Sequence, residues 1–338
     1  MQEKILNCYC KNYSKTIGSN MKKNLLLIIL LFCFLESREQ TFNPYAEIDA
    51  YVVQKGKMDS FNLNEITKSI TENIVEKKLK CRAIYYWIAN QINLDPKITQ
   101  NQSNDNIQPE IVIKTRKTSP SGFSLLFQEM CSLCGIRCLV VDGYSRWTSE
   151  DIGLVQENIN HSWNVVQLGN SNEEWYYVDV AKASGYFNDK GNIFYKQFSG
   201  DYFFTKDATF NLDHFPSNKA WMLGHSNLDN KRFYNLPIIG NAAYQIELSN
   251  MLPKNGLIHA QSNKPLKFEI EYKNRTPITN ILAIVIEGKK QQKEERINFM
   301  DSNSKITFNY TFKKETTLLF TILSDNKILL TYNVEVEE

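Results

Sequence analysis

Two side chains that could carry out acid–base chemistry lie on neighbouring predicted strands. His161 opens a strand over 161–168, and Asp179 lies near the end of a strand over 175–180. An imidazole commonly serves as the general base for a nucleophile, and a carboxylate beside it orients the ring. A hairpin around the polar turn 169–174 can bring the two side chains together, although their register cannot be read from the sequence. Taken alone, His161 is an ordinary core or surface histidine and Asp179 a turn residue.

Cys131 and Cys134 have the CxxC spacing of a redox or metal site. A structural metal site needs four ligands at matching spacing, and the sequence offers no second pair. We therefore expect Cys81, Cys131, Cys134 and Cys138 to be buried small side chains without disulfides. The sequence predicts no metal and no other cofactor.

The elements that must position these residues are helices followed by strands. Ser119 and Pro120 predict a helix start, a hydroxyl cap followed by proline at the first helical position, and Gly135 predicts its end. Helices are also predicted from Asn62 and over about 77–92. A helix packed on a run of strands indicates an α+β fold.

The last hundred residues change character. Leu266–Tyr272 and Ile306–Phe312 alternate strictly between apolar and polar positions, and further strands are predicted over 281–286, 318–323 and 328–336. This spacing predicts an antiparallel β-sandwich of the immunoglobulin-like kind over 238–338.

Composition excludes several classes of function. The chain has 338 residues, 42% of them hydrophobic and 22% charged, and its net charge is +2 with both signs interspersed. These values are typical of a globular protein with ordinary cores. Without a basic stripe, the sequence predicts no nucleic-acid partner.

The first 40 residues predict export. Met21-Lys22-Lys23 precedes an apolar run over 25–35 and a polar exit, which is typical of a secretory signal over 21–39. The run is too short to span a membrane. Residues 1–20 are interpreted as a misassigned upstream extension. Cys33 is not expected to carry a lipid anchor, because Phe32 is bulky where a small residue is needed. The mature protein is expected in the periplasm or outside the cell, where it could associate with the outer surface.

Three segments and their order resemble the transglutaminase-like superfamily, whose members share a papain-type Cys-His-Asp arrangement. The likeness is greatest to the kyphoscoliosis-peptidase-type branch and its exported bacterial relatives. It covers about Tyr45 to Leu223 and implies a papain-like domain over 42–225. The segments are Cys81-Arg-Ala-Ile-Tyr-Tyr-Trp-Ile-Ala-Asn90, Arg116-Lys-Thr-Ser-Pro-Ser-Gly-Phe-Ser-Leu-Leu-Phe-Gln-Glu-Met-Cys131 and His161-Ser-Trp-Asn-Val-Val166 with Trp175-Tyr-Tyr-Val-Asp179.

The resemblance implies that His161 is the base and Asp179 its orienting carboxylate. In the family the helix opens with a pattern like Arg-Lys-Gly-x-Cys-x-Gly-aromatic. Here Pro120 stands at the cysteine position and Thr118 at the first glycine. Proline has no nucleophilic atom, so the helix start is kept and the reactive group is lost.

Two functions remain open. In the first, the protein is a pseudoenzyme whose remnant cleft binds a peptide or protein, with Ser119, Ser121 and Trp163 near the ligand. In the second, it is an active hydrolase or acyl transferase that uses Ser119 or Ser121 with His161 and Asp179. The second requires the imidazole to lie within about 3 Å of a serine hydroxyl.

Overall fold

The computed structural model describes residues 43–95, 107–169, 171, 174–188, 193–274, 278–287 and 291–338. The predicted extension (1–20), the predicted signal peptide (21–39) and Cys33 lie outside the described residues. Glu47–Glu338 form one compact unit. Among the helices of the described ranges, none combines the length and apolar character that crossing a membrane needs.

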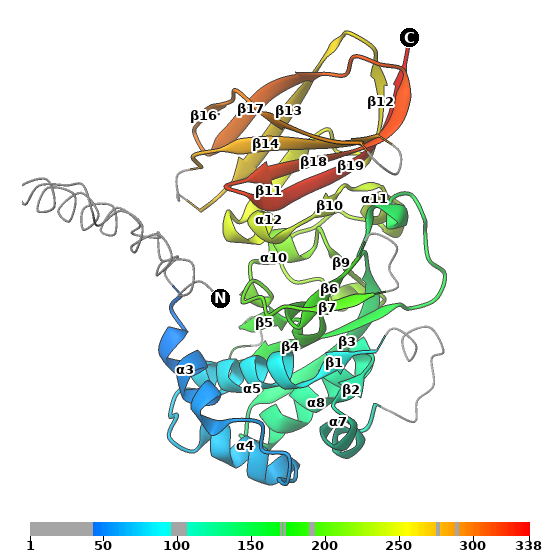
Figure 1. Cartoon of the computed structure of the whole chain (residues 1–338). Helices are drawn as coiled ribbons and strands as arrows, with labels where there is room; N and C mark the ends of the chain where they lie inside the picture. Colours follow the sequence, from blue (N-terminus) through cyan, green and yellow to red (C-terminus); the bar gives the residue numbers. More distant parts are fainter. Residues whose placement is uncertain are drawn as a thin grey trace, which may run out of the picture. The chain divides into compact units, whose positions relative to one another are not determined.

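The helices lie mainly in the first part of the chain (Figure 1). They are α3 (Ala46–Lys55), α4 (Leu63–Thr71), α5 (Lys77–Gln91), α7 (Pro109–Thr115), α8 (Pro120–Leu133), α9 (Val180–Ala183), α10 (Asp207–Phe210), α11 (Asn230–Asn235), α12 (Asn241–Gln245) and the short 3₁₀ helices η2 (Ser149–Asp151) and η3 (Lys219–Trp221).

The predicted helix starts are found where capping residues stand. Asn62 caps α4 and forms a reciprocal capping box with Glu65. α8 begins at Pro120 after Ser119 in an extended conformation, but the Ser119 hydroxyl makes no capping bond. Gly135 follows the end of α8 with a φ of +66°, a conformation that glycine adopts without strain.

A five-stranded antiparallel sheet carries the candidate site residues. Its spatial order is β8-β5-β4-β3-β9. The strands are β3 (Arg137–Ser145), β4 (His161–Gln167), β5 (Trp175–Val178), β8 (Phe203–Thr205) and β9 (His214–Pro216). α8 packs against it, since Asn164 Nδ2 donates to the carbonyl of Ser124 and Gln128 Nε2 to that of Cys138.

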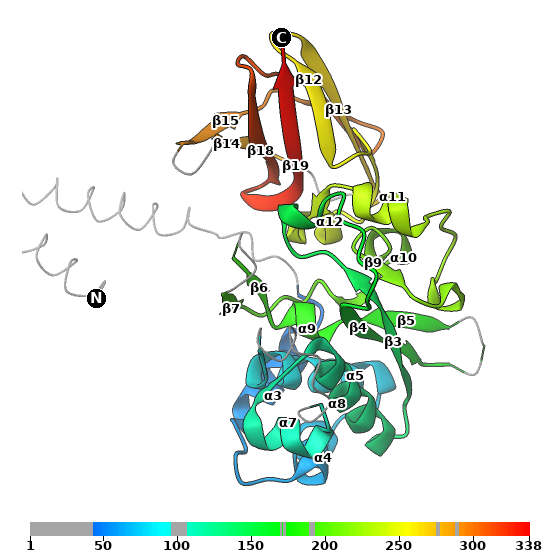
Figure 2. The ribbon, with the colours of Figure 1, turned by 90° about the vertical axis from the view of Figure 1, so that its right-hand side faces the viewer.

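Two larger sheets form the C-terminal part. One has the order β10-β19-β18-β14-β15 with β12 paired to β19, and the other has the order β11-β13-β17-β16. The strands are β10 (Ile238–Ile239), β11 (Leu248–Leu252), β12 (Leu257–Gln261), β13 (Pro265–Tyr272), β14 (Ile281–Glu287), β15 (Gln291–Arg296), β16 (Met300–Ser302), β17 (Lys305–Thr311), β18 (Thr316–Ser324) and β19 (Lys327–Glu337). Figure 2 shows β18 and β19 side by side. Phe268 of β13 contacts Phe320 of β18 and Tyr332 of β19, so aromatic rings join the two sheets.

Short paired strands complete the described elements. β1 (Asn93–Leu94) pairs with β2 (Lys117–Thr118) in parallel, and β6 (Gly185–Phe187) pairs with β7 (Phe194–Lys196) in an antiparallel hairpin. The chain therefore has the mixed helix and strand content that the sequence predicts, with many antiparallel pairings toward its C-terminus.

The four cysteines of the described chain are unbridged, as predicted. Cys81, Cys131 and Cys138 are buried, whereas Cys134 is half-buried because it lies at the end of α8, where the helix reaches the surface. Burial raises the pKa of the Cys131 thiol. Burial also raises the pKa of the Cys134 thiol, where the hydrogen bond to Thr71 and the charge of Lys80 oppose it. A raised pKa lowers the thiolate fraction and therefore the reactivity.

We expect native protein to react slowly with iodoacetamide at Cys134 and not measurably at the three buried thiols. All four should react once the protein is unfolded in urea. Mass spectrometry of the labelled peptides gives the result. Rapid native labelling of Cys81, Cys131 or Cys138, or a disulfide between any two of the four, would contradict the expectation.

Candidate functional site

Strand register brings three polar side chains to one face of the five-stranded sheet. His161 pairs with Gly143 of β3, and Ser145 of β3 pairs with His214 of β9. Because side chains on the same face recur at every second residue, His161 and His214 lie on the same face. Asp179 directly follows β5, whose Val178 pairs with Asn164, so the register continues to the neighbourhood of His161. The sheet therefore gathers two histidines around one aspartate.

Asp179 accepts three hydrogen bonds. Its Oδ2 lies 2.6 Å from Nε2 of His161 and 2.8 Å from Nε2 of His214, and its Oδ1 accepts the backbone N–H of Lys182 at 3.0 Å as the cap of α9. Burial opposes ionisation of this carboxyl, but the charges and hydrogen bonds of the two imidazoles outweigh it and hold the pKa of Asp179 well below its usual value. Asp179 is therefore ionised at neutral pH, and both Nε2 atoms carry a proton toward it.

The imidazole of His161 is closed off from solvent. Its side chain and that of Asp179 have no exposed area, and within the described part of the chain its Nδ1 has no hydrogen-bond partner. Trp147 stands edge-on to the ring at 5.6 Å between centroids, and Trp163 is stacked on it at 6.1 Å. Since Nε2 donates to Asp179, the neutral ring leaves Nδ1 as an unpaired acceptor. This is the nitrogen that could take a proton from a nucleophile.

His214 belongs to this group, and the sequence did not single it out. Its ring is stacked on Phe210 at 3.8 Å, and its Nδ1 lies 3.3 Å from the carbonyl of Phe210. Complete burial lowers its pKa, opposed by the hydrogen bond to Asp179 and the charge of Asp213. No local pattern could have paired His214 with Asp179, because their contact depends on β9 pairing with β3.

A second buried ion pair adjoins the two histidines. Nζ of Lys182 donates to Oδ2 of Asp213 at 2.6 Å and to the carbonyl of Arg146 at 2.8 Å, and the Tyr244 hydroxyl donates to the same carboxylate oxygen. Burial lowers the pKa of Arg146 to about 10, so it remains charged at neutral pH. Arg146 and Lys182 then balance Asp179 and Asp213, which leaves no net charge when both imidazoles are neutral.

The start of α8 lies against the start of β4. Ser162 donates its hydroxyl proton to Oδ1 of Asp142 at 2.6 Å. The 3.0 Å contact between the hydroxyls of Ser121 and Ser162 must therefore have Ser121 as the donor. Pro120 is buried at the first helical position, and Ser119 and Ser121 are half-buried on either side of it. Among the described residues, no hydrogen bond joins either serine to His161.

Thr118 fills space at the same helix start. It is fully buried, and a Cβ added to Gly122 would lie 1.8 Å from its Oγ1. Gly122 is therefore needed for α8 to approach Thr118. Trp163, which the sequence placed near a ligand, is fully buried beneath His161 and His214. Its ring packs the site in the structure and leaves Ser119 and Ser121 as the accessible residues of the predicted set.

Within the described chain, His161, Asp179 and His214 are the group whose donor atoms gather closely enough to consider a metal ion, all within 4.8 Å of one another. Ligand atoms on a tetrahedral zinc ion lie about 3.3 Å apart. Here the carboxylate oxygen lies 2.6 and 2.8 Å from the two nitrogens, which are hydrogen-bond distances. The arrangement fits a hydrogen-bonded carboxylate better than a metal centre.

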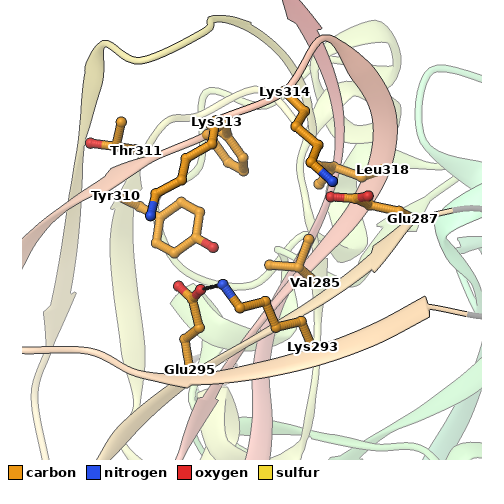
Figure 3. Close-up of a pocket in the computed structure, with 10 residues that line it drawn as sticks. Val285, Glu287, Lys293, Glu295, Tyr310, Thr311, Lys313, Lys314 and Leu318 are labelled. Carbon is orange, nitrogen blue, oxygen red and sulfur yellow. Dashed lines mark hydrogen bonds and ion pairs between the residues drawn. The ribbon is translucent and has the colours of Figure 1, made fainter.

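A hollow of about 200 Å³ opens elsewhere, among the C-terminal strands (Figure 3). Figure 3 shows Lys313 and Lys314 above it, with Lys293 paired to Glu295 on its lower side. None of the residues that line it belongs to the predicted site.

The buried histidine predicts a pH dependence of stability. The pKa of His214 is lowered from its ordinary 6.5 in the folded chain, so the unfolded chain binds the proton first on acidification. Stability should therefore be complete above about pH 6.5 and fall as the pH drops from there to the folded pKa, by at most about 1.4 kcal/mol per pH unit for one proton. A second loss of stability should follow below pH 3.8, the ordinary pKa of an aspartate such as Asp179.

Urea unfolding between pH 7.5 and 5 measures the first loss of stability. A His214→Gln variant should show a flatter profile in that range, and an equal slope in both proteins would refute this assignment.

Comparison with known proteins shows what this chain is similar to. Residues 64–180 match the family model described as the transglutaminase-like superfamily. The chain is 27% identical over 230 residues to the kyphoscoliosis peptidase of Mus musculus, an alignment that covers 68% of this chain and 34% of that protein. It is 24% identical over 218 residues to the Lim and transglutaminase domain protein ltd-1 of Caenorhabditis elegans, covering 62% and 30%. The chain thus spans about a third of the length of these curated relatives.

A solved structure described as a TGase covers 46% of this chain and 37% of its own, with 13% identity and a TM-score of 0.26, a value too low to carry an argument. The family-model match includes Pro120, His161 and Asp179 and ends before His214. Residues 64–180 of this chain are therefore similar in sequence to the transglutaminase-like superfamily.

Proposed function

We propose that this protein is a catalytically inactive transglutaminase-like protein that acts as a binding or interaction module. The observation that carries the proposal is Pro120 at the first position of α8, where the family's nucleophile is expected. His161 and Asp179 keep their hydrogen bond, so the base and its orienting carboxylate persist without a group for them to activate.

The neighbouring hydroxyls do not replace the thiol. Ser121 donates to Ser162, and Ser124, one turn further, donates to the carbonyl of Pro120. A serine nucleophile needs a base in hydrogen-bonding reach, because its hydroxyl is far less acidic than a thiol. Among the described residues, neither serine hydroxyl is hydrogen-bonded to Nδ1 of His161, the nitrogen that could accept a proton, and the His161 side chain is closed to solvent.

Activity profiling of the full chain tests inactivity. We expect neither thiol-reactive nor serine-reactive probes to label the native protein at α8, and no amide hydrolysis or acyl transfer above a buffer control. A serine probe located by mass spectrometry on Ser119 or Ser121, with labelling abolished by His161→Gln, would establish the hydrolase instead.

The ligand that we propose is a peptide or protein segment that lies across the start of α8. Ser119 is half-buried and its hydroxyl caps nothing, so enlarging it disturbs no helix bond. In selections from a displayed random peptide library, Ser119→Tyr should reduce recovery of wild-type-selected peptides at least tenfold. Ser132→Tyr, an exposed position near the other end of α8, is the matched control and should bind as wild type. If the wild type recovers no peptide, or if both variants bind equally well, the proposal of a peptide ligand at the start of α8 is wrong.

We further propose that the protein is exported and that its C-terminal strands form an immunoglobulin-like sandwich. The apolar run over 25–35 behind two lysines supports export. The aromatic contacts between the two C-terminal sheets support the sandwich. Fractionation of cells that produce the full chain, with sequencing of the mature N-terminus, tests export. A protein that retains residues 21–39 inside the cell would refute it.

A further inference from the structure

The hydrogen-bond count at Asp179 exceeds what a single His–Asp pair needs. One oxygen, Oδ2, receives both imidazole Nε2 atoms, and the other receives the N-terminus of α9. The side chains of His161, Asp179 and His214 have no exposed area, so bulk solvent reaches none of them. A buried carboxylate stays ionised only when hydrogen bonds and charges compensate its desolvation. His214 therefore supplies part of what keeps Asp179 charged.

The surroundings of His214 hold its ring in one orientation. Phe210 is stacked against one face at 3.8 Å and 10°, and Trp163 stands edge-on at 5.2 Å. The ring nitrogen turned away from Asp179 lies near two acceptors, the carbonyl of Phe210 at 3.3 Å and Oδ2 of Asp213 at 3.9 Å. The other nitrogen, Nε2, lies closer to its acceptor, 2.8 Å from Oδ2 of the ionised Asp179, and a bare nitrogen there would repel the carboxylate. The neutral ring therefore places its one proton on Nε2, where the hydrogen bond is shorter and the acceptor is charged.

We propose that His214 is a positioning residue, which donates its Nε2–H to Asp179 and thereby fixes the carboxylate so that His161 keeps its own proton on Nε2 and presents a bare Nδ1. The inference rests on the proposed function in that it treats His161 and Asp179 as a remnant base pair. It adds that His161, Asp179 and His214 act together as one hydrogen-bonded group. His214 lies outside residues 64–180, the segment that matches the family model. His214 acts through Asp179 and touches no ligand.

This arrangement has a measurable consequence for His161. With His214 in place, the charge on Oδ2 is shared between two donors. Without it, His161 alone faces that charge, and an imidazole beside a less compensated carboxylate binds a proton more tightly. Removing the donor from position 214 should therefore make His161 easier to protonate.

Nitrogen NMR of the full chain, labelled with ¹⁵N-histidine, tests the proposal. In the wild type, both His161 and His214 should be in the tautomer with the proton on Nε2. In His214→Phe, the midpoint of His161 protonation should rise by about one pH unit, a tenfold increase in proton affinity. His214→Gln, whose amide can donate to Asp179, should reverse at least half of that rise. His259→Phe removes an exposed histidine paired with Glu335 and should leave His161 unchanged.

The wild-type spectrum alone can overturn the proposal, even where His214→Phe does not fold. A bare Nε2 on His214 would mean that it does not donate to Asp179. Equal titration of His161 in the wild type and His214→Phe, or equal shifts in the Phe and Gln variants, would show that His214 only fills space. These outcomes are independent of the probe-labelling experiment, which can refute inactivity without changing either tautomer.

Discussion

Pro120→Cys is expected to create a reactive thiol where none exists in the wild type. The new sulfur would stand at the first position of α8, a fourteen-residue helix whose start contacts the residue after His161. A helix N-terminus and a neighbouring imidazole together lower a thiol pKa from about 8.5 into the range of about 3.5–7.5. The rate of alkylation by iodoacetamide should therefore rise through a midpoint below pH 8 and far exceed that of the buried native cysteines.

The fold should tolerate this substitution. Proline at the first helical position supplies no hydrogen bond, and most residues are accepted there. The carbonyl of Ser119 keeps its bond from the N–H of Phe123, so the first turn is retained. Circular dichroism and the urea midpoint should match the wild type closely.

Pro109→Cys provides a matched control. Pro109 also occupies the first position of a helix, α7, which contains neither His161 nor Asp179. Its thiol should show only the modest effect of a helix end. His161→Gln should raise the thiol pKa in the Pro120→Cys protein and leave the Pro109→Cys thiol unchanged. If both thiols titrate alike and ignore residue 161, then Pro120 does not occupy the nucleophile position.

Reactivity toward a small reagent need not bring turnover. Thr118 is fully buried against Gly122 at the same helix start, where the family carries glycine. We expect amide hydrolysis or acyl transfer, if a Pro120→Cys protein gains either, to increase further in Thr118→Gly/Pro120→Cys. Absence of any gain in the double variant would indicate that the closure of His161 by Trp147 also prevents catalysis.

Local patterns predicted the elements of this fold more fully than its pairings. The cap at Asn62 and the proline start of α8 follow from chemistry within a few residues. The helix α7 was not predicted, because its seven residues are too few to show a helical period.

The strand partners and the contact of His214 with Asp179 depend on pairing between distant segments, which the sequence alone did not predict. β12 pairs with β19 in parallel, and β9 pairs with β3. The hydrophobic pattern within each of these strands does not indicate which strand is its partner. His214 reaches Asp179 only through the second of these pairings. The contact of His161 with Asp179 was foreseeable as a hairpin, whereas its register and the second imidazole required the folded sheet.

Asp179→Ala is expected to be the most destabilising single substitution at the site. It removes the acceptor of two buried imidazole protons and of the first turn of α9. Leaving a buried polar partner unpaired costs about 1–3 kcal/mol, and three donors lose their acceptor in this variant. We therefore expect the free energy of unfolding in urea to fall by about 3–5 kcal/mol at pH 7.

Asp229→Ala separates this effect from simple helix capping. Asp229 caps α11 by accepting the N–H of Arg232, the same three-residue spacing that joins Asp179 to Lys182, but it is exposed and meets no histidine. Loss of a cap alone costs about 0.5–2 kcal/mol. The loss in free energy of unfolding should be larger in Asp179→Ala than in Asp229→Ala, and the difference measures the cost of leaving the two imidazoles without their acceptor. An excess below about 1 kcal/mol would mean that the histidines find other acceptors, because an unpaired buried donor costs at least that much.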